Sequence, residues 1–121
     1  MKTIIAGSRS ITSFAEACAA IEGCGWRISE VVSGAARGVD RLGERWASQT
    51  GVPVIRFPAQ WDIHGKRAGV YRNQAMAEYA DALIAIWDGQ SNGTKHMIDA
   101  ASKRGLRVHV VVCASGPVHS A

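Results

Sequence analysis

The sequence predicts an α/β protein of three layers, with a five-stranded parallel sheet and helices on both faces. Short runs rich in β-branched and other apolar residues recur at regular intervals, and helix-like patterns fill the gaps between them. This alternation of strand and helix is typical of a parallel sheet covered by helices. The runs are apolar at most positions rather than at every second one, as expected for strands that are buried on both faces.

The five expected strands begin and end with the apolar runs. They cover residues 2–6, 28–33, 53–57, 82–87 and 107–112. The first connection contains a helix signal, because Ser13 and Glu16 have the spacing of a capping box. Apolar residues then follow at i, i+3, i+4 and i+7, which predicts one buried stripe. Three further helices are expected over residues 39–50, 68–80 and 94–104, and Gly51 and Gly105 follow two of them as stop signals.

Length and composition predict one globular domain. The chain has 121 residues, of which 47% are hydrophobic and 20% charged. We expect a single domain over residues 2–113 and a flexible C-terminal tail over residues 114–121. No apolar run is long enough for a membrane span, and the N-terminus is too short in apolar residues for a signal peptide. Three cysteines without a Cys-x-x-Cys spacing favour a reduced, cytoplasmic location.

The loops that follow the strands carry the functional signal. In a parallel sheet these loops open at one edge, where ligands bind. Here they cover residues 7–10, 34–40, 58–67 and 88–94, and they are rich in glycine and arginine. A glycine-rich loop that leads into a helix binds phosphate well, although tight turns also need glycine. The net charge of +4 and the excess of arginine over lysine favour an anionic ligand.

Arg72 is the most informative single residue. It starts a stripe of apolar residues at helical spacing, where a charge is unusual. We expect its side chain to point toward the loop edge of the sheet and to bind ligand. The alternative is an internal salt bridge to Asp40 or Asp88.

Each of three other residues has two possible roles, one structural and one in ligand binding. Asn73 either closes a turn or contacts ligand, and Asp88 either belongs to an Asp-Gly turn or faces a ribose. Trp61 lies in the longest loop, which could act as a lid, and its ring could stack on a base.

Several common sites are excluded by their motifs. No Gly-x-Gly-x-x-Gly follows the first strand, and the segment over residues 89–95 is one residue short of a P-loop, with Thr and Lys in reverse order. No pair of His or carboxylate residues has metal-ligand spacing, so we expect neither a metal nor a cofactor.

Four segments together form a familiar pattern: residues 7–9 (GSR), 33–40 (SGAARGVD), 71–73 (YRN) and 91–94 (SNGT). The pattern resembles the SLOG superfamily, which includes the DNA-processing protein A (Smf) domain and the Lonely Guy enzymes. It is most similar to the small stand-alone bacterial and phage group called YspA, or cpYpsA-related SLOG. The resemblance spans residues 2–112 and implies a Rossmann-like sheet that binds a nucleotide or a nucleotide-derived molecule at these loops.

The resemblance keeps one motif of the Lonely Guy enzymes and lacks their catalytic residue. The Arg-Lys-x-x-Met motif of Lonely Guy enzymes is kept as residues 72–76 (RNQAM), but the position of their catalytic Glu is Met97. Methionine cannot transfer a proton. The catalytic residue is therefore unknown, with Asp88 as a weak candidate and Asp40 as a further substitute.

A nucleotide-binding, sensor-type domain with a phosphate site at the loop edge is the function that these observations favour. The alternatives are cleavage of the N-glycosidic bond of a nucleoside monophosphate and the binding of single-stranded DNA. Aromatic and basic residues do not interleave along the chain, which argues against nucleic acid as a partner. A homodimer is compatible with the resemblance, because relatives associate. The predicted ligand-binding residues are Gly7, Ser8, Arg9, Ser33, Gly34, Ala35, Arg37, Gly38, Asp40, Arg72, Asn73, Asp88, Gly89, Ser91, Gly93 and Thr94.

Overall fold

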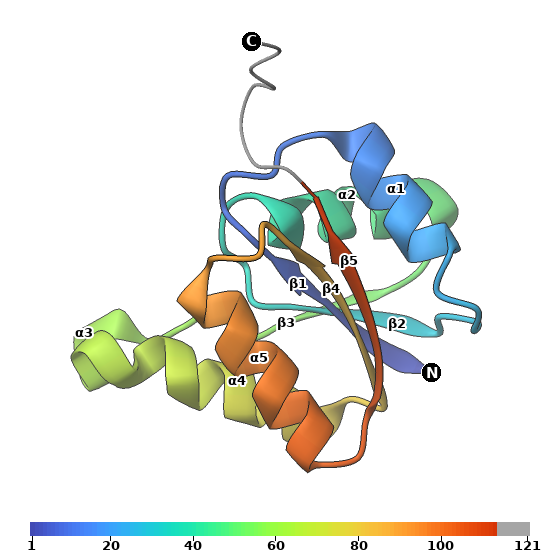
Figure 1. Cartoon of the computed structure of the whole chain (residues 1–121). Helices are drawn as coiled ribbons and strands as arrows, with labels where there is room; N and C mark the ends of the chain where they lie inside the picture. The colour runs from blue at the N-terminus through green and yellow to red at the C-terminus, as the bar shows by residue number, and fades with distance from the viewer. Residues whose placement is uncertain (114–121) are drawn as a thin grey trace, which may run out of the picture.

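Five strands form one parallel sheet in the order β3-β2-β1-β4-β5 in the computed structural model, which describes residues 1–113 (Figure 1). The strands are β1 (Lys2–Gly7), β2 (Glu30–Ser33), β3 (Val54–Arg56), β4 (Ala82–Trp87) and β5 (Arg107–Val112). The helices are α1 (Phe14–Glu22), α2 (Val39–Thr50), α3 (Trp61–His64), α4 (Ala68–Tyr79) and α5 (Asn92–Lys103), with a 3₁₀ turn, η1 (Gly65–Arg67), between α3 and α4. The predicted Rossmann-like α/β fold is confirmed.

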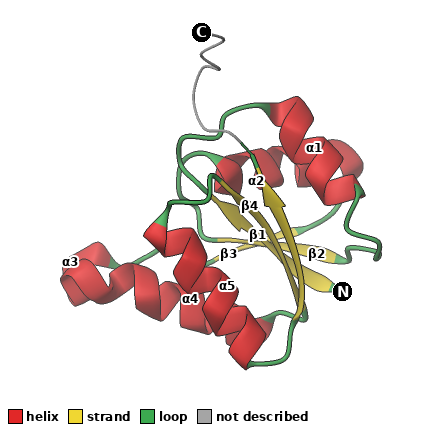
Figure 2. Cartoon of the chain, viewed as in Figure 1, coloured by secondary structure: helices red, strands yellow, loops and turns green. Residues whose placement is uncertain are grey.

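Helices cover both faces of the sheet (Figure 2). On one face, Ile5, Ile84 and Ile86 pack in one core with α1 and α2. On the other face, Ile4 and Leu83 pack in a second core with α4 and α5. Successive side chains of a strand point to opposite faces, so the central strands β1 and β4 must be apolar at consecutive positions. Their uninterrupted apolar sequence therefore follows from their central place in the sheet.

The edge strands depart from the expectation of strands buried on both faces. β3 spans only three residues, none of them fully buried. β5 lies at the other edge, and its Val110 and Val112 are exposed. Strands at an edge have only one neighbour, so a continuous apolar run does not guarantee burial there. The expected third strand is also shorter than predicted, and β2 starts at Glu30 rather than at residue 28.

The segment over residues 58–67 is not the loop that the sequence predicted. It contains the short helix α3 and the turn η1, and Gly65 ends α3 with a positive φ of 56°. Figure 1 shows α3 standing out from the body of the fold at the start of α4. Only four residues are helical, too few to leave a periodic pattern in the sequence.

The N-termini of α1 and α5 follow the capping rules. Ser13 accepts a hydrogen bond from the Glu16 N–H at 3.2 Å, as the capping box predicts. Ser91 caps α5 in the same way, so this helix begins at Asn92 rather than at Thr94. Within residues 1–113, no helix is both long and apolar enough to cross a membrane. The predicted C-terminal tail, residues 114–121, lies outside the described residues.

Candidate functional site

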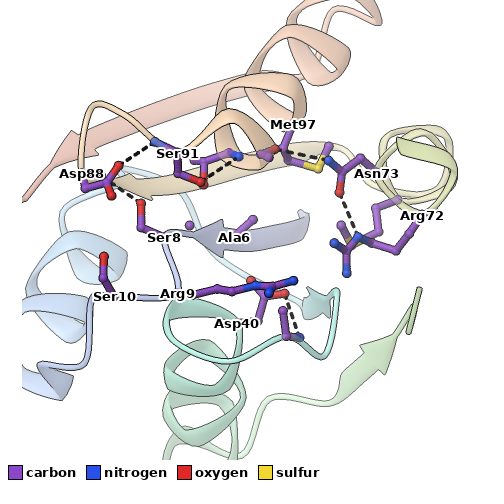
Figure 3. A pocket seen from close by; sticks show the side chains of 15 residues that line it. Ala6, Ser8, Arg9, Ser10, Asp40, Arg72, Asn73, Asp88, Ser91 and Met97 are labelled. Atoms are coloured by element: carbon purple, nitrogen blue, oxygen red, sulfur yellow. Dashed lines mark hydrogen bonds between the residues drawn. The ribbon is translucent and has the colours of Figure 1, made fainter. Parts of the chain in front are cut away.

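The strand order reverses beside β1. The chain runs from β1 to β2 and β3 on one side, and then crosses over to β4 and β5 on the other side. Ligands of open parallel sheets bind beyond the carboxyl ends of the strands at such a point. A pocket of about 440 Å³, here called the central pocket, opens there (Figure 3). Its lining residues are Ala6, Gly7, Ser8, Arg9, Ser10, Ala36, Asp40, Arg72, Asn73, Met76, Asp88, Ser91, Gly93, Thr94 and Met97.

The floor of the central pocket is formed where β1 and β4 end. The Ser8 N–H donates to the carbonyl oxygen of Ile86 at 3.1 Å, and the Ser8 hydroxyl accepts from the Asp88 N–H at 3.0 Å. Gly7 lies so close to β4 that a Cβ atom there would be 2.0 Å from the Ile86 carbonyl oxygen. The absence of a side chain at Gly7 therefore allows the two strand ends to meet.

Arg72 reaches the pocket from the first half of α4. Its Nη1 donates to the carbonyl oxygen of Gly34 at 2.7 Å, and its Nε donates to Oδ1 of Asn73 at 2.9 Å. A Cβ atom on Gly34 would lie 2.5 Å from Arg72 Nη1 and 2.8 Å from Asp40 Oδ2. The guanidinium and the carboxylate therefore flank the same glycine. Burial lowers the pKa of Arg72, and the nearby Asp40 charge opposes this effect.

The internal salt bridge considered for Arg72 is not formed. Across residues 1–113, the one ion pair joins Arg56 to Glu44 at 2.8 Å, and Glu44 also accepts a hydrogen bond from Ser33 Oγ at 2.6 Å. Arg72 is instead held by two neutral acceptors, which leaves its charge without a paired anion within 4 Å in this part of the chain. This residue can thus supply positive charge to a ligand.

Asn73 connects the two helices that flank the pocket. Its side chain accepts the hydrogen bond from Arg72, and its Nδ2 lies 3.3 Å from the Gly93 carbonyl oxygen and 3.1 Å from His96 Nδ1. Asn73 is almost completely buried. These contacts fix the Arg72 side chain relative to the first turn of α5. Asn73 therefore positions the guanidinium group that lines the pocket.

Asp40 is a buried carboxylate in the central pocket. It is 5% exposed and accepts a hydrogen bond from the Ala36 N–H at 3.2 Å. Burial raises its pKa to about 6, although the Ala36 N–H, Arg72 and Arg9 act in the opposite direction. The carboxylate of Glu44, one helical turn further along α2, adds to the increase. A carboxyl group with this pKa can exchange a proton near neutral pH.

Asp88 has a different environment. Its Oδ1 accepts hydrogen bonds from the N–H groups of Gln90 and Ser91, both at 2.8 Å. These hydrogen bonds lower its pKa. The carboxylate of Asp88 therefore shapes the turn that precedes α5, and Asp40 is the better placed of the two for proton transfer.

A second hollow of about 260 Å³, here called the arginine pocket, adjoins the central pocket. Both pockets are lined by Arg9, Ala36 and Arg72. The remaining lining residues of the arginine pocket are Gly34, Ala35, Arg37, Pro58, Ala59 and Trp61. Three arginines and no carboxylate from the described residues line this hollow, so its electrostatic potential favours an anion.

Most of the predicted binding residues gather at these two pockets. Only Ser33, Gly38 and Gly89 line neither of them. Ser33 is fully buried and bonds to Glu44 on α2, a Cβ atom on Gly38 would lie 2.5 Å from the Arg9 Cα, and Gly89 is exposed in the turn after β4. Glycine and serine have structural uses in such loops, and sequence spacing does not separate these uses from ligand binding.

Five lining residues of the central pocket were not predicted. They are Ala6, Ser10, Ala36, Met76 and Met97. Met76 and Met97 follow the apolar stripes of α4 and α5, so their spacing indicated only a place in the core. The signal that could have placed them at the site is the family resemblance, since Met76 ends the RNQAM motif and Met97 occupies the position of the catalytic Glu of Lonely Guy enzymes.

Comparison with known proteins identifies the family of the chain. A profile of the YspA, cpYpsA-related SLOG family matches residues 1–64, which include β1, β2, the loops that carry Arg9 and Arg37, and the start of α2 with Asp40. The chain belongs to this SLOG family. Gene 61 protein of Mycobacterium phage D29 is 43% identical over 84 residues, covering 64% of this chain and 67% of the phage protein. No solved structure matches the chain significantly.

The family match ends before α4 begins. Arg72, Asn73 and the first turn of α5 therefore lie outside the matched residues. Their assignment to the site of this SLOG protein rests on the hydrogen bonds and the shared pocket described above.

Proposed function

We propose that this SLOG protein binds a nucleotide or a nucleotide-derived small molecule, with a phosphate group at Arg9 and Arg72. The observation that carries the proposal is that these two arginines, 63 positions apart, line the same two pockets at the reversal point of the sheet. Figure 3 shows the Arg9 side chain extending across the pocket toward Arg72. Guanidinium groups bind phosphate through paired hydrogen bonds, which makes them suited to this ligand.

Backbone groups support the same proposal. Ser91 and Thr94, at the start of α5, line the central pocket, and Gly93 lies between them without a side chain. The N-terminus of a helix carries a partial positive charge and N–H groups that point outward. A phosphate held by Arg9 and Arg72 would therefore also face a favourable helix end.

Replacing Arg9 with alanine tests the phosphate site. Arg9 is exposed, and its side chain forms no ion pair within residues 1–113, so the fold should be retained. Loss of one charge-assisted contact of roughly 1.5–3 kcal/mol lowers the affinity for AMP by about 10- to 100-fold. Isothermal titration calorimetry with AMP measures this change.

The matched control is Arg104→Ala. Arg104 is also exposed, but it follows the carboxyl end of α5, on the side of the sheet where the strands begin and away from the pockets. This variant should bind AMP as the parent does. Equal affinities for the parent and Arg9→Ala would contradict the assignment of Arg9, and equal losses in both variants would indicate a general charge effect.

N-glycosidic hydrolysis is a second candidate, favoured by Asp40. Its carboxyl group lines the central pocket, and its pKa of about 6 leaves a usable protonated fraction near neutral pH. In this reaction water attacks the anomeric carbon, the bond from carbon to the base nitrogen breaks, and Asp40 gives its proton to the departing base. The proton released by the attacking water returns the carboxylate to its acid form.

The hydrolase candidate predicts free base after incubation with nucleoside monophosphates, detected by chromatography. Asp40→Asn cannot donate a proton in this way, so base release should fall by at least about 100-fold. Asp99→Asn is the control, because Asp99 is exposed on α5 and lines neither pocket. No base released by the parent protein from any of the common nucleoside monophosphates would eliminate this candidate.

A further inference from the structure

Two arginine side chains lie between the central pocket and the arginine pocket, rather than at the closed end of either one. Arg9 and Arg72 line both the central pocket and the arginine pocket. A phosphate bound to this shared wall therefore has space on each side. A mononucleotide has a terminal phosphate and would fill only one of these spaces.

The two hollows differ in chemistry. On the central side, hydroxyl, amide and carboxylate groups surround the space, among them Ser8, Asn73 and Asp88. Carboxylates repel a second phosphate but accept hydrogen bonds from sugar hydroxyls. On the other side, the arginine pocket has no carboxylate among its described lining residues, and it contains Arg37 and the aromatic ring of Trp61.

Trp61 has an accessible aromatic ring. Its side chain is 53% exposed, although it is among the largest apolar side chains of the protein. A Cβ atom on Gly69 would lie 3.6 Å from Trp61 Cη2 and 3.9 Å from Arg72 Nη2. The end of the indole ring and the guanidinium of Arg72 therefore flank the same glycine.

We infer that the ligand is a phosphate-bridged nucleotide, with substituents on both sides of its phosphate group. The sugar or other polyol on one side occupies the central pocket. The phosphate bridge lies on Arg9 and Arg72, and a nucleoside base on the other side stacks on Trp61 in the arginine pocket. This inference rests on the proposed function and adds to it the position of the phosphate within the ligand.

Three probes separate a bridged ligand from a terminal phosphate. ADP-ribose has a diphosphate bridge with a sugar on one side and a nucleoside on the other, whereas AMP and ribose 5-phosphate each have a terminal phosphate. By isothermal titration calorimetry, we expect ADP-ribose to bind at least about tenfold more tightly than either smaller compound. Trp61→Ala should weaken ADP-ribose by about tenfold, the effect of losing one stacking contact, and leave ribose 5-phosphate unchanged.

Ile63→Ala is the matched control. Ile63 lies on the same short helix and is 66% exposed, but it lines neither pocket. This variant should bind all three probes as the parent does. The inference is overturned if AMP or ribose 5-phosphate binds as tightly as ADP-ribose, or if Trp61→Ala and Ile63→Ala have the same effect on ADP-ribose. Failure of all three probes to bind the parent protein would instead remove the proposed function itself.

Discussion

Replacing Gly7 with alanine is expected to destabilise the protein by about 2–3 kcal/mol, the usual cost of forcing extra volume into a packed region. The new Cβ atom would lie 2.0 Å from the Ile86 carbonyl oxygen and 2.7 Å from Cγ2 of Val39. The first contact is with backbone, which cannot rotate away, so β1 and β4 must separate at their carboxyl ends. Thermal denaturation should show a Tm lower by roughly 10 °C.

Gly93→Ala is the control for this prediction. A Cβ atom at Gly93 meets no atom within 4 Å among the described residues, and Gly93 lies in the first turn of α5. Alanine is the better helix former, so this variant should be as stable as the parent or slightly more stable. A Tm for Gly7→Ala within about 2 °C of the parent would show that the strand ends can adjust to the extra atom.

Asp40→Asn is expected to remove a pH dependence of stability. An ordinary aspartate has a pKa of 3.8, and burial raises that of Asp40 to about 6. The folded protein therefore binds the Asp40 proton more tightly than the unfolded chain does. The resulting stabilisation is complete below pH 3.8 and is lost as the pH rises through 6, with a total of about 3 kcal/mol.

The groups that face Asp40 determine the size of this change. Arg9 and Arg72 favour the ionised carboxylate, whereas Glu44 opposes it. Urea denaturation of the parent and of Asp40→Asn between about pH 4 and pH 8 gives the difference in their free energies of unfolding. That difference should shift in favour of the variant as the pH rises, while Asp99→Asn should follow the parent. A constant difference over this range would contradict the raised pKa of Asp40.

The sheet and its four main helices could be predicted from the sequence because each leaves a local signal. The central strands are continuous apolar runs, and Ser13 with Glu16 marks the start of α1. The edge position of β3 and β5 has no such signal, since the order of strands depends on contacts far apart in the chain. Helix α3 was missed because one turn of helix shows no periodicity.

The candidate site was predicted in outline but not in its internal contacts. The loop positions follow from the rule that βα loops share one edge of a parallel sheet. Arg72, in contrast, donates to a carbonyl group 38 positions away, and the charges that act on the pKa of Asp40 come from three separate segments. Such contacts depend on tertiary packing, so local sequence patterns do not report them. The division of the site into two adjoining pockets is likewise a property of the folded chain.

The central pocket takes its walls from the ends of β1 and β4, the loop after β2, and the helices α2, α4 and α5. Distant parts of the chain meet there only after folding, so the denatured protein offers no comparable surface. Any molecule that occupies the pocket is thereby linked to the folding equilibrium. At a concentration of about 100 times its Kd, such a molecule adds about 2.7 kcal/mol to the stability of the native state. Resistance to heat can therefore rank chemically diverse compounds by affinity, whether or not the protein transforms them.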